Sequence, residues 1–249
     1  MKRALDTSGS QPPAEVPEGL RIYAVGDIHG REDLLIQMHA LIRADARFSR
    51  GLKYKIVYLG DYVDRGAQSF DVIETLLYDP FTDFKRVFLK GNHEEMMLNF
   101  IAGPPGSLWT SNGGLATLAS YGVIAEDSFF FHRDLAEARR SLIAALPPAH
   151  RAFLNELRVY HTEGDYLFVH AGIRPGTALG FQDDRDLLWI RDPFLSSDAD
   201  FGKRVVHGHT ITAEPEVRHN RIGIDTGAFS TGRLTCLVLE GNSIRFLQT

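Results

Sequence analysis

The feature that most constrains the fold of this chain is a unit that occurs three times in its first hundred residues. Each unit is an apolar run, a glycine-containing polar loop, and a segment with apolar residues at helical spacing. The apolar runs cover 21–25, 56–59 and 86–89, and the helical patterns follow at 34–42, 70–77 and 96–101. Strands alternating with helices at this interval predict βαβ units and a largely parallel sheet. In such sheets ligands bind at the carboxyl ends of the strands.

The rest of the chain divides into a helical part and a second set of strands. Residues 103–157 have a mostly helical pattern, clearest at 135–146, and we expect a helical insertion lying over the site rather than a separate domain. Further strands are expected near 159–161, 166–169, 205–206 and 222–224, a closing hairpin at 234–247, and a long loop over 174–203. Residues 1–19 predict a disordered tail, so one domain is expected over 20–249.

Composition limits the partners and the compartment that we expect. The chain has 249 residues, a net charge of −5 and no basic block, which argues against nucleic acid binding by phosphate neutralisation. Its single cysteine, Cys236, excludes an intramolecular disulfide and suits a reducing compartment. No stretch predicts a membrane span or a signal peptide, so we expect a cytoplasmic protein without a membrane partner.

Three charged residues follow the second apolar run within the stretch Gly60-Asp61-Tyr62-Val63-Asp64-Arg65-Gly66. Two carboxylates this close repel each other unless a cation lies between or beside them. Our hypothesis is that Asp61 bridges two metal ions, Asp64 supports a catalytic group and Arg65 binds a phosphate oxygen. The alternative is a solvated turn with a local ion pair between Asp64 and Arg65.

Five predicted strands end in the same way, with Asp, Asn or His beside glycine. The candidate metal ligands are Asp27, His29, Asp61, Asn92, His170 and His209. Oxygen and imidazole ligands without thiolate suit Mn, Fe, Zn or Mg. A single histidine at a strand end is usually structural, but five such coincidences at one sheet edge indicate a metal site.

The motifs Gly-Asp-Ile-His-Gly, Gly-Asp-Tyr-Val-Asp-Arg-Gly, Gly-Asn-His-Glu, His-Ala-Gly and Gly-His-Thr together resemble the phosphoprotein phosphatase family of calcineurin-like metallophosphoesterases. They occur in that family's order between residues 26 and 210, and the second and third are the most specific. The resemblance implies an α/β fold with a central β-sandwich of two mixed sheets flanked by helices. The expected organisation is therefore one metallophosphoesterase domain that carries the helical insertion as a cap.

The resemblance also implies a role for each motif residue. One metal ion would take Asp27, His29 and Asp61, and the second would take Asp61, Asn92, His170 and His209. His93 would be the general acid, oriented by Asp64, and Arg65 would hold phosphate. The reaction implied is direct attack by a hydroxide that bridges two divalent ions, for which manganese is favoured.

The residue types support those roles independently. Two divalent ions about 3.5–4 Å apart can share a water, lower its pKa and clamp phosphoryl oxygens. An imidazole near two cations tends to lose its proton, and a carboxylate such as Asp64 restores it to His93. Arg65 can bind two phosphate oxygens at once. Asn92 and Arg191 are further candidates for phosphate binding, and the alternative for Arg191 is an ion pair with Asp184, Asp186 or Asp192.

The motifs favour a phosphomonoesterase. Ile211 stands where many diesterases and nucleases of the superfamily have a second histidine. We expect a protein phosphatase acting on Ser/Thr or Tyr, because related diadenosine polyphosphate hydrolases often lack an acid at the position of Asp64. The alternatives are a symmetrical dinucleoside polyphosphate hydrolase and a metal-dependent binding module without turnover. A binding module would not need His93. The expected substrate is a phosphoprotein or a small phosphoester.

Other motifs resemble catalytic signatures without supporting context. Asp225-Thr226-Gly227 is similar to an aspartic protease motif, which needs a second aspartate. We expect Asp225 to hydrogen-bond a ligand histidine or a loop amide. Cys236 lies inside a predicted strand, which argues against a cysteine phosphatase. His207 stands two residues before His209 and is a candidate contact to substrate or to a water molecule outside the metal ligands.

Overall fold

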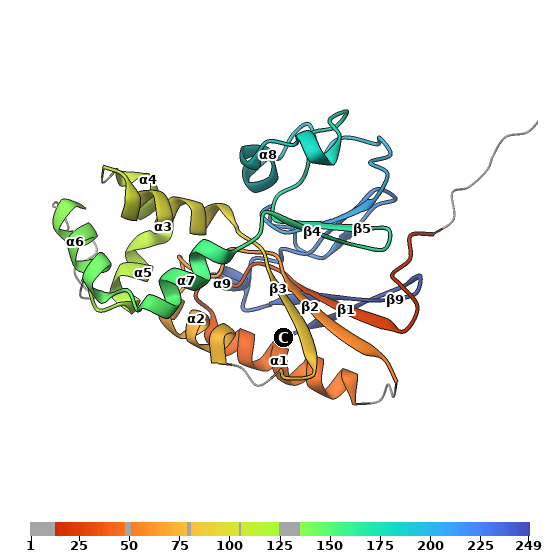
Figure 1. Cartoon of the computed structure of the whole chain (residues 1–249), viewed down its shortest axis with the longest axis horizontal. Helices are drawn as coiled ribbons and strands as arrows, with labels where there is room; N and C mark the ends of the chain where they lie inside the picture. The colour runs from red at the N-terminus through yellow and green to blue at the C-terminus, as the bar shows by residue number, and fades with distance from the viewer. Residues whose placement is uncertain (1–12, 48–50, 79–80, 105, 125–134) are drawn as a thin grey trace, which may run out of the picture.

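The computed structural model describes residues 13–47, 51–78, 81–104, 106–124 and 135–249. Within these ranges two five-stranded sheets pack face to face, with helices over the outer face of the first sheet (Figure 1). This is the β-sandwich of two mixed sheets flanked by helices that the sequence predicts, and the predicted fold class is confirmed.

The first sheet has the strand order β10-β9-β1-β2-β3. Its strands are β1 (Leu20–Val25), β2 (Lys53–Tyr58), β3 (Phe84–Phe88), β9 (Thr235–Glu240) and β10 (Ser243–Gln248). β1, β2 and β3 are parallel, whereas β9 runs antiparallel to β1 and to β10. The three repeated units therefore form the parallel part, and the C-terminal hairpin makes the sheet mixed.

The second sheet has the order β4-β5-β6-β8-β7. Its strands are β4 (Tyr160–Glu163), β5 (Tyr166–Val169), β6 (Arg204–His207), β7 (Glu216–Val217) and β8 (Arg221–Gly223). β5, β6 and β8 are parallel, and β4 and β7 are antiparallel edge strands. Each sheet thus has three parallel strands whose carboxyl ends lead into polar loops.

Helices connect the strands and form the insertion. They are α1 (Glu32–Ala46), α2 (Ser69–Tyr78), α3 (Asn92–Ala102), α4 (Ser107–Trp109), a π-helical segment (Thr110–Gly114), α5 (Leu115–Ser120), α6 (Leu135–Ala145), α7 (Pro148–Glu156), a 3-10 turn (Leu179–Phe181), α8 (Asp184–Trp189) and α9 (Ala228–Thr231). The helices from α3 to α7 extend to one side of the sandwich (Figure 1).

The alternation of side chains along each strand explains the layers. On β2 and just beyond it, Ile56 and Tyr58 join the apolar cluster beneath the helices, and Val57 and Leu59 join the cluster between the two sheets. Successive residues of a strand face opposite sides of a sheet, so a strand buried on both faces needs a continuous apolar run. That is why the apolar runs in this sequence do not alternate with polar residues.

Four expectations need correction. Residues 13–19 are not a disordered tail, because Val16 is buried and its N–H donates to Gly241 O at 3.0 Å, whereas residues 1–12 lie outside the described ranges. The expected loop 174–203 contains α8, whose short apolar pair Leu187 and Leu188 is too brief for a periodicity argument. The third helix, expected over 96–101, begins earlier, because Asn92 is the first residue of α3. Finally, the alternation of strands and helices alone predicts a largely parallel sheet, but β9 and β10 add antiparallel pairing, as the family resemblance implies.

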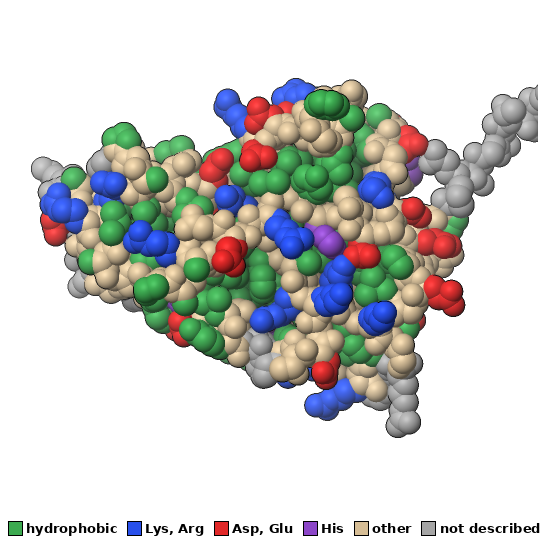
Figure 2. All heavy atoms as spheres, viewed as in Figure 1, with side chains coloured by type: hydrophobic (Ala, Val, Ile, Leu, Met, Phe, Trp, Pro, Cys, Tyr) green, Lys and Arg blue, Asp and Glu red, His purple; other side chains and the backbone are tan. Residues whose placement is uncertain are grey.

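No helix in the described ranges is both long and apolar enough to cross a membrane. On the face drawn in Figure 2, basic and acidic side chains are interspersed rather than gathered into one continuous field.

Candidate metal centre

The loops that carry the motifs contain unusual backbone conformations. The non-glycine residues with positive φ in the described ranges are His29 (48°), Asp61 (53°), Asp64 (73°), Arg65 (69°) and His209 (62°). A left-handed conformation is costly for such residues and persists only where surrounding structure enforces it. All of them are predicted site residues, so the strain is concentrated where side chains must turn away from the strand direction.

Four ligand atoms of the expected second metal set converge. Asn92 Oδ1 lies 2.9 Å from His170 Nε2 and 2.9 Å from His209 Nδ1, and His170 Nε2 lies 3.5 Å from Asp61 Oδ1. His170 Nδ1 donates to Leu59 O at 3.0 Å, so its Nε2 carries a lone pair. Lone pairs of nitrogen and oxygen thus face each other at short range, an arrangement that a cation stabilises.

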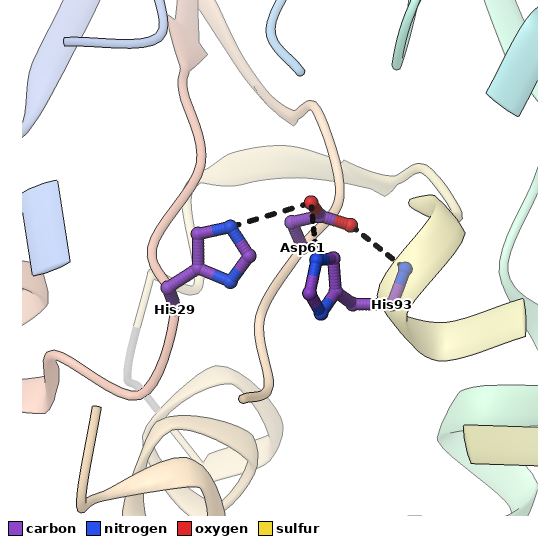
Figure 3. A group of neighbouring side chains, drawn as sticks. All are labelled: His29, Asp61 and His93. Atoms are coloured by element: carbon purple, nitrogen blue, oxygen red, sulfur yellow. Dashed lines mark hydrogen bonds and ion pairs between the residues drawn. The ribbon is translucent and has the colours of Figure 1, made fainter. Parts of the chain in front are cut away.

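The expected first set is only partly assembled. The side chains whose ligand atoms all lie within 4.8 Å of one another are His29, Asp61 and His93, without Asp27. Figure 3 shows these three directed toward one another, from the loops after β1 and β2 and from the start of α3. Asp61 also belongs to the second set, as expected of a bridging ligand.

Asp27 lies on the side of His209 instead. Asp27 Oδ2 accepts from the backbone N–H of His209 at 3.0 Å, and Oδ1 is buried without a hydrogen-bond partner among the described residues. A Cβ on Gly208 would lie 2.0 Å from Oδ1, so only glycine makes room for this carboxylate. The hydrogen bond from the backbone N–H of His209 holds the carboxylate in this position. A buried carboxylate oxygen without a hydrogen-bond donor fits a role as a cation ligand.

The imidazoles of the centre are held neutral. Burial lowers the pKa of His29 to about 3 and that of His209 to about 2, and it also lowers the pKa of His170. His29 Nδ1 donates to Val63 O at 2.9 Å, which leaves Nε2 free of hydrogen, as a metal ligand requires.

The pKa values of the Asp27 and Asp61 carboxyl groups are shifted in opposite directions. Burial, then Asp225 and Asp61, raise the pKa of Asp27 well above its ordinary value. Burial alone would raise the pKa of Asp61 too, but the imidazoles around it, His170 first, lower it well below its ordinary value. Neutral imidazoles, a carboxylate held ionised and an oxygen without a donor together fit two divalent ions of borderline or hard character.

His93 and Asp64 form a buried pair beside this centre. His93 Nδ1 lies 2.7 Å from Asp64 Oδ2, and both side chains are almost fully buried. Burial would lower the pKa of His93, but Asp61 and Asp64 together raise it. His93 can therefore hold a proton close to Asp61, which is the property of a general acid.

Two arginines face the same centre. Arg65 Nη1 lies 3.0 Å from His29 Nε2 and Nη2 lies 3.2 Å from His93 Nε2, and the guanidinium stacks 4.7 Å from the ring centroid of Phe229. Arg191 is exposed and close enough to lower the pKa values of His170 and His209. Within the described residues no ion pair joins Arg191 to an acid, and Asp186 pairs with Arg174 instead.

Sequence reasoning missed several residues of the site. Glu94 is fully buried and accepts four backbone N–H groups, from Gly91 and from the loop that carries Asp61. Its place in Gly-Asn-His-Glu was the available signal. Trp109 and Thr117 both donate to Asp64, and only the tertiary structure brings them there.

The other candidates lie at the margin. Asp225 is buried beside Asp27 and accepts from the N–H of Gly227 at 2.9 Å, a loop amide. His207 is buried, with Nδ1 bonded to Gly208 O at 3.1 Å and Nε2 facing Arg221 at 3.3 Å, so it does not point into the metal centre. Cys236 is buried within β9.

Comparison of the sequence with known proteins identifies a family and several relatives. The sequence profile described as "Calcineurin-like phosphoesterase" matches residues 20–229. "Serine/threonine-protein phosphatase 1" of Salmonella typhimurium is 30% identical over 222 residues, covering 86% of this chain and 89% of its own. "Serine/threonine-protein phosphatase 2" of Escherichia coli is 28% identical over 227 residues, covering 86% and 90%.

A relative that is named for a different activity is nearly as similar in sequence. The "Bis(5'-nucleosyl)-tetraphosphatase [asymmetrical]" of Oceanobacillus iheyensis is 25% identical over 237 residues, covering 87% of each chain. Among solved structures, a candidate diadenosine tetraphosphatase superposes with a TM-score of 0.62 at 21% identity, covering 94% of this chain and 98% of its own. A cold-active protein tyrosine phosphatase gives 0.56 at 16% identity, covering 99% and 86%. At these identities the structures support the fold alone.

Proposed function

The chain belongs to the calcineurin-like phosphoesterase family, and we propose that within it this protein hydrolyses phosphomonoesters, with phosphoproteins as its principal substrate class. The observation that carries the proposal is the pair of His93 and Asp64, 2.7 Å apart and beside Asp61. Ligand binding alone does not require a proton donor held by a buried carboxylate.

The proposed division of labour follows the geometry. Two divalent cations held by Asp27, His29, Asp61, Asn92, His170 and His209 would activate water and neutralise phosphate charge. Arg65 and Arg191, whose side chains are exposed, bind the phosphoryl oxygens. His93 gives its proton to the leaving oxygen, and Asp64 keeps that imidazole oriented and protonated. Asn92, whose Oδ1 lies 2.9 Å from both His170 Nε2 and His209 Nδ1, would contact the second cation and the substrate.

The test is steady-state hydrolysis of p-nitrophenyl phosphate and of phenyl phosphate, which has the poorer leaving group, by protein stripped of metal and reloaded with Mn²⁺. We expect activity to depend on the metal, to vanish in Asp61→Asn, and to fall by about 10²–10⁴-fold in His93→Asn on a substrate with a poor leaving group. His219→Asn is the matched control, because His219 is exposed and remote from the motifs. Full activity in stripped protein would overturn the proposal.

A second candidate is hydrolysis of dinucleoside tetraphosphates, which the name of the Oceanobacillus relative favours. That relative is described as asymmetrical, whereas the alternative expected from the sequence was a symmetrical hydrolase. Diadenosine tetraphosphate and phosphopeptides carrying phosphoserine, phosphothreonine or phosphotyrosine should be compared at equal concentration. Two ADP molecules would indicate symmetrical cleavage, and ATP with AMP would indicate asymmetrical cleavage. A kcat/KM at least tenfold higher for phosphopeptides is the expected result.

A further inference from the structure

Two side chains of the helical insertion hold the carboxylate of Asp64. Trp109 Nε1 donates to Asp64 Oδ1 at 3.0 Å and to Oδ2 at 2.8 Å, and Thr117 Oγ1 donates to Oδ1 at 2.6 Å. The backbone N–H of Asp64 in turn donates to Thr117 Oγ1 at 2.9 Å and to Ser69 Oγ at 3.0 Å. None of these side chains is more than 1% exposed, so water cannot replace a lost partner.

These contacts leave the Asp64 carboxylate no free rotation. Oδ1 is shared by Thr117 and Trp109, and Oδ2 is shared by Trp109 and His93. Because these donors fix the orientation of the carboxylate, Oδ2 stays directed at His93 Nδ1. The orientation of the His93 imidazole therefore depends on Trp109 and Thr117, which are 45 and 53 positions away from Asp64 in the chain.

We propose that Trp109 and Thr117 are positioning residues for the proton donor, acting on His93 through Asp64, so that the insertion is part of the catalytic apparatus. The inference rests on the proposed phosphoester hydrolysis. Neither residue is expected to touch substrate or metal. Without the two donors, Asp64 gains alternative orientations, and His93 delivers its proton to the leaving oxygen less often.

The same segment supports Arg65 by a separate contact. The N–H of Arg65 donates to Gly113 O at 3.2 Å, and a Cβ on Gly113 would lie 2.9 Å from Arg65. Gly113 also has φ of 107°, which other residues rarely adopt. The insertion thus reaches the catalytic loop at two separable points, the proton donor through Trp109 and Thr117, and the phosphate ligand through Gly113.

The decisive experiment compares leaving groups. Phenyl phosphate needs a proton at its leaving oxygen, whereas p-nitrophenyl phosphate needs little help. We expect Trp109→Phe and Thr117→Val to lower kcat by roughly tenfold on phenyl phosphate and by less than about twofold on p-nitrophenyl phosphate, a part of the full general-acid effect. Gly113→Ala should instead raise KM for both substrates.

The matched control is Tyr121→Phe. Tyr121 belongs to the same insertion, and its buried hydroxyl bonds to His150 at 2.7 Å without contacting Asp64. This variant should lose stability as Trp109→Phe does, but it should leave the ratio of the two kcat values unchanged. In a His93→Asn background, Trp109→Phe should have no further effect on phenyl phosphate. Equal losses on both substrates, or additive losses in that background, would overturn the proposal.

A readout without turnover separates this inference from the proposed function. The chain has two tryptophans, so Trp109→Phe identifies the Trp109 indole N–H signal by nuclear magnetic resonance. In the wild type we expect slow exchange of that proton and a downfield His93 Nδ1 proton. Trp109→Phe and Thr117→Val should shift or broaden the His93 signal, and Tyr121→Phe should not. An unchanged His93 signal would refute positioning even if the protein hydrolyses phosphoesters, and a changed one would support it even if the substrate differs.

Discussion

Glu94 offers the sharpest test of how the metal centre is held together. Its carboxylate is fully buried; Oε1 accepts from the N–H groups of Tyr62 and Val63 at 2.7 and 3.2 Å, and Oε2 accepts from those of Asp61 and Gly91 at 2.9 Å each. One side chain therefore fixes the loop that carries Asp61 to the start of α3. The perturbation is Glu94→Gln, which keeps the shape and replaces one oxygen with an amide NH₂.

The magnitude follows from counting donors. In either orientation of a glutamine amide, two backbone N–H groups face an NH₂ group that cannot accept. Each buried donor left unsatisfied costs about 1–3 kcal/mol, so the expected loss is about 4 kcal/mol of unfolding free energy. For a chain of this size that lowers Tm by roughly 8–16 °C. Because Asp61 is displaced with its loop, Mn²⁺ affinity should also fall by roughly 10–100-fold.

The assay is thermal unfolding of metal-free protein together with calorimetric titration of Mn²⁺. Glu95→Gln is the matched control, because Glu95 is only half-buried and accepts one hydrogen bond, from Trp189 Nε1 at 2.6 Å. A glutamine can keep that bond, so the control should cost less than about 1 kcal/mol. If Glu94→Gln and Glu95→Gln have the same Tm and the same affinity for Mn²⁺, the four-donor argument is wrong.

Three further outcomes are expected. Burial raises the pKa of Asp225 to about 6 and that of neighbouring Asp27 above its ordinary value, so at low pH both carboxyl groups hold protons that Mn²⁺ must displace. As the pH drops below about 6, the affinity for Mn²⁺ should fall and the proton release measured by calorimetry should rise. An Mn²⁺ affinity that is constant from pH 5 to 8 would contradict this. Gly208→Ala places a Cβ 2.0 Å from Asp27 Oδ1 and should weaken Mn²⁺ binding by more than roughly tenfold. Gly106 has open space around it, so Gly106→Ala should leave Mn²⁺ binding unchanged. Equal Mn²⁺ affinities of the two variants would show that Gly208 is not needed to make room for the Asp27 carboxylate. Arg65→Lys keeps the charge but loses the paired donors, so KM for p-nitrophenyl phosphate and Ki for inorganic phosphate should both rise about tenfold, and unchanged values would remove Arg65 from phosphate binding.

The sequence was sufficient for the parts of the site that are local. Apolar runs ending in Asp, Asn or His beside glycine are readable because a strand buried on both faces must be continuously apolar and its end must turn. The parallel units at 21–25, 56–59 and 86–89 then place three motif loops at one sheet edge, and β1, β2 and β3 form as expected. The close spacing of Asp61, Asp64 and Arg65 could likewise be interpreted from the sequence, because it does not depend on contacts with distant residues.

Short elements were beyond such reasoning. α8 and α9 have six and four residues, fewer than two helical turns, so no periodicity marks them. β7 has two residues and is held by pairing with β8 rather than by its own propensity. The packing of Val16 against the sheets was also hidden, because the composition of the N-terminal segment is typical of a disordered tail.

By itself the sequence determined which chemical groups are available and at which strand ends they stand, since both depend on residue type and on periods of two and 3.6. Only the tertiary structure decided which of them meet: that Asp27 bonds to the backbone of His209 and lies outside the group of His29, Asp61 and His93, and that Trp109 and Thr117 hold Asp64. Such contacts join residues 45 to 182 positions apart, and the orientation of a buried carboxylate is set by donors that packing brings to it, which no local pattern encodes.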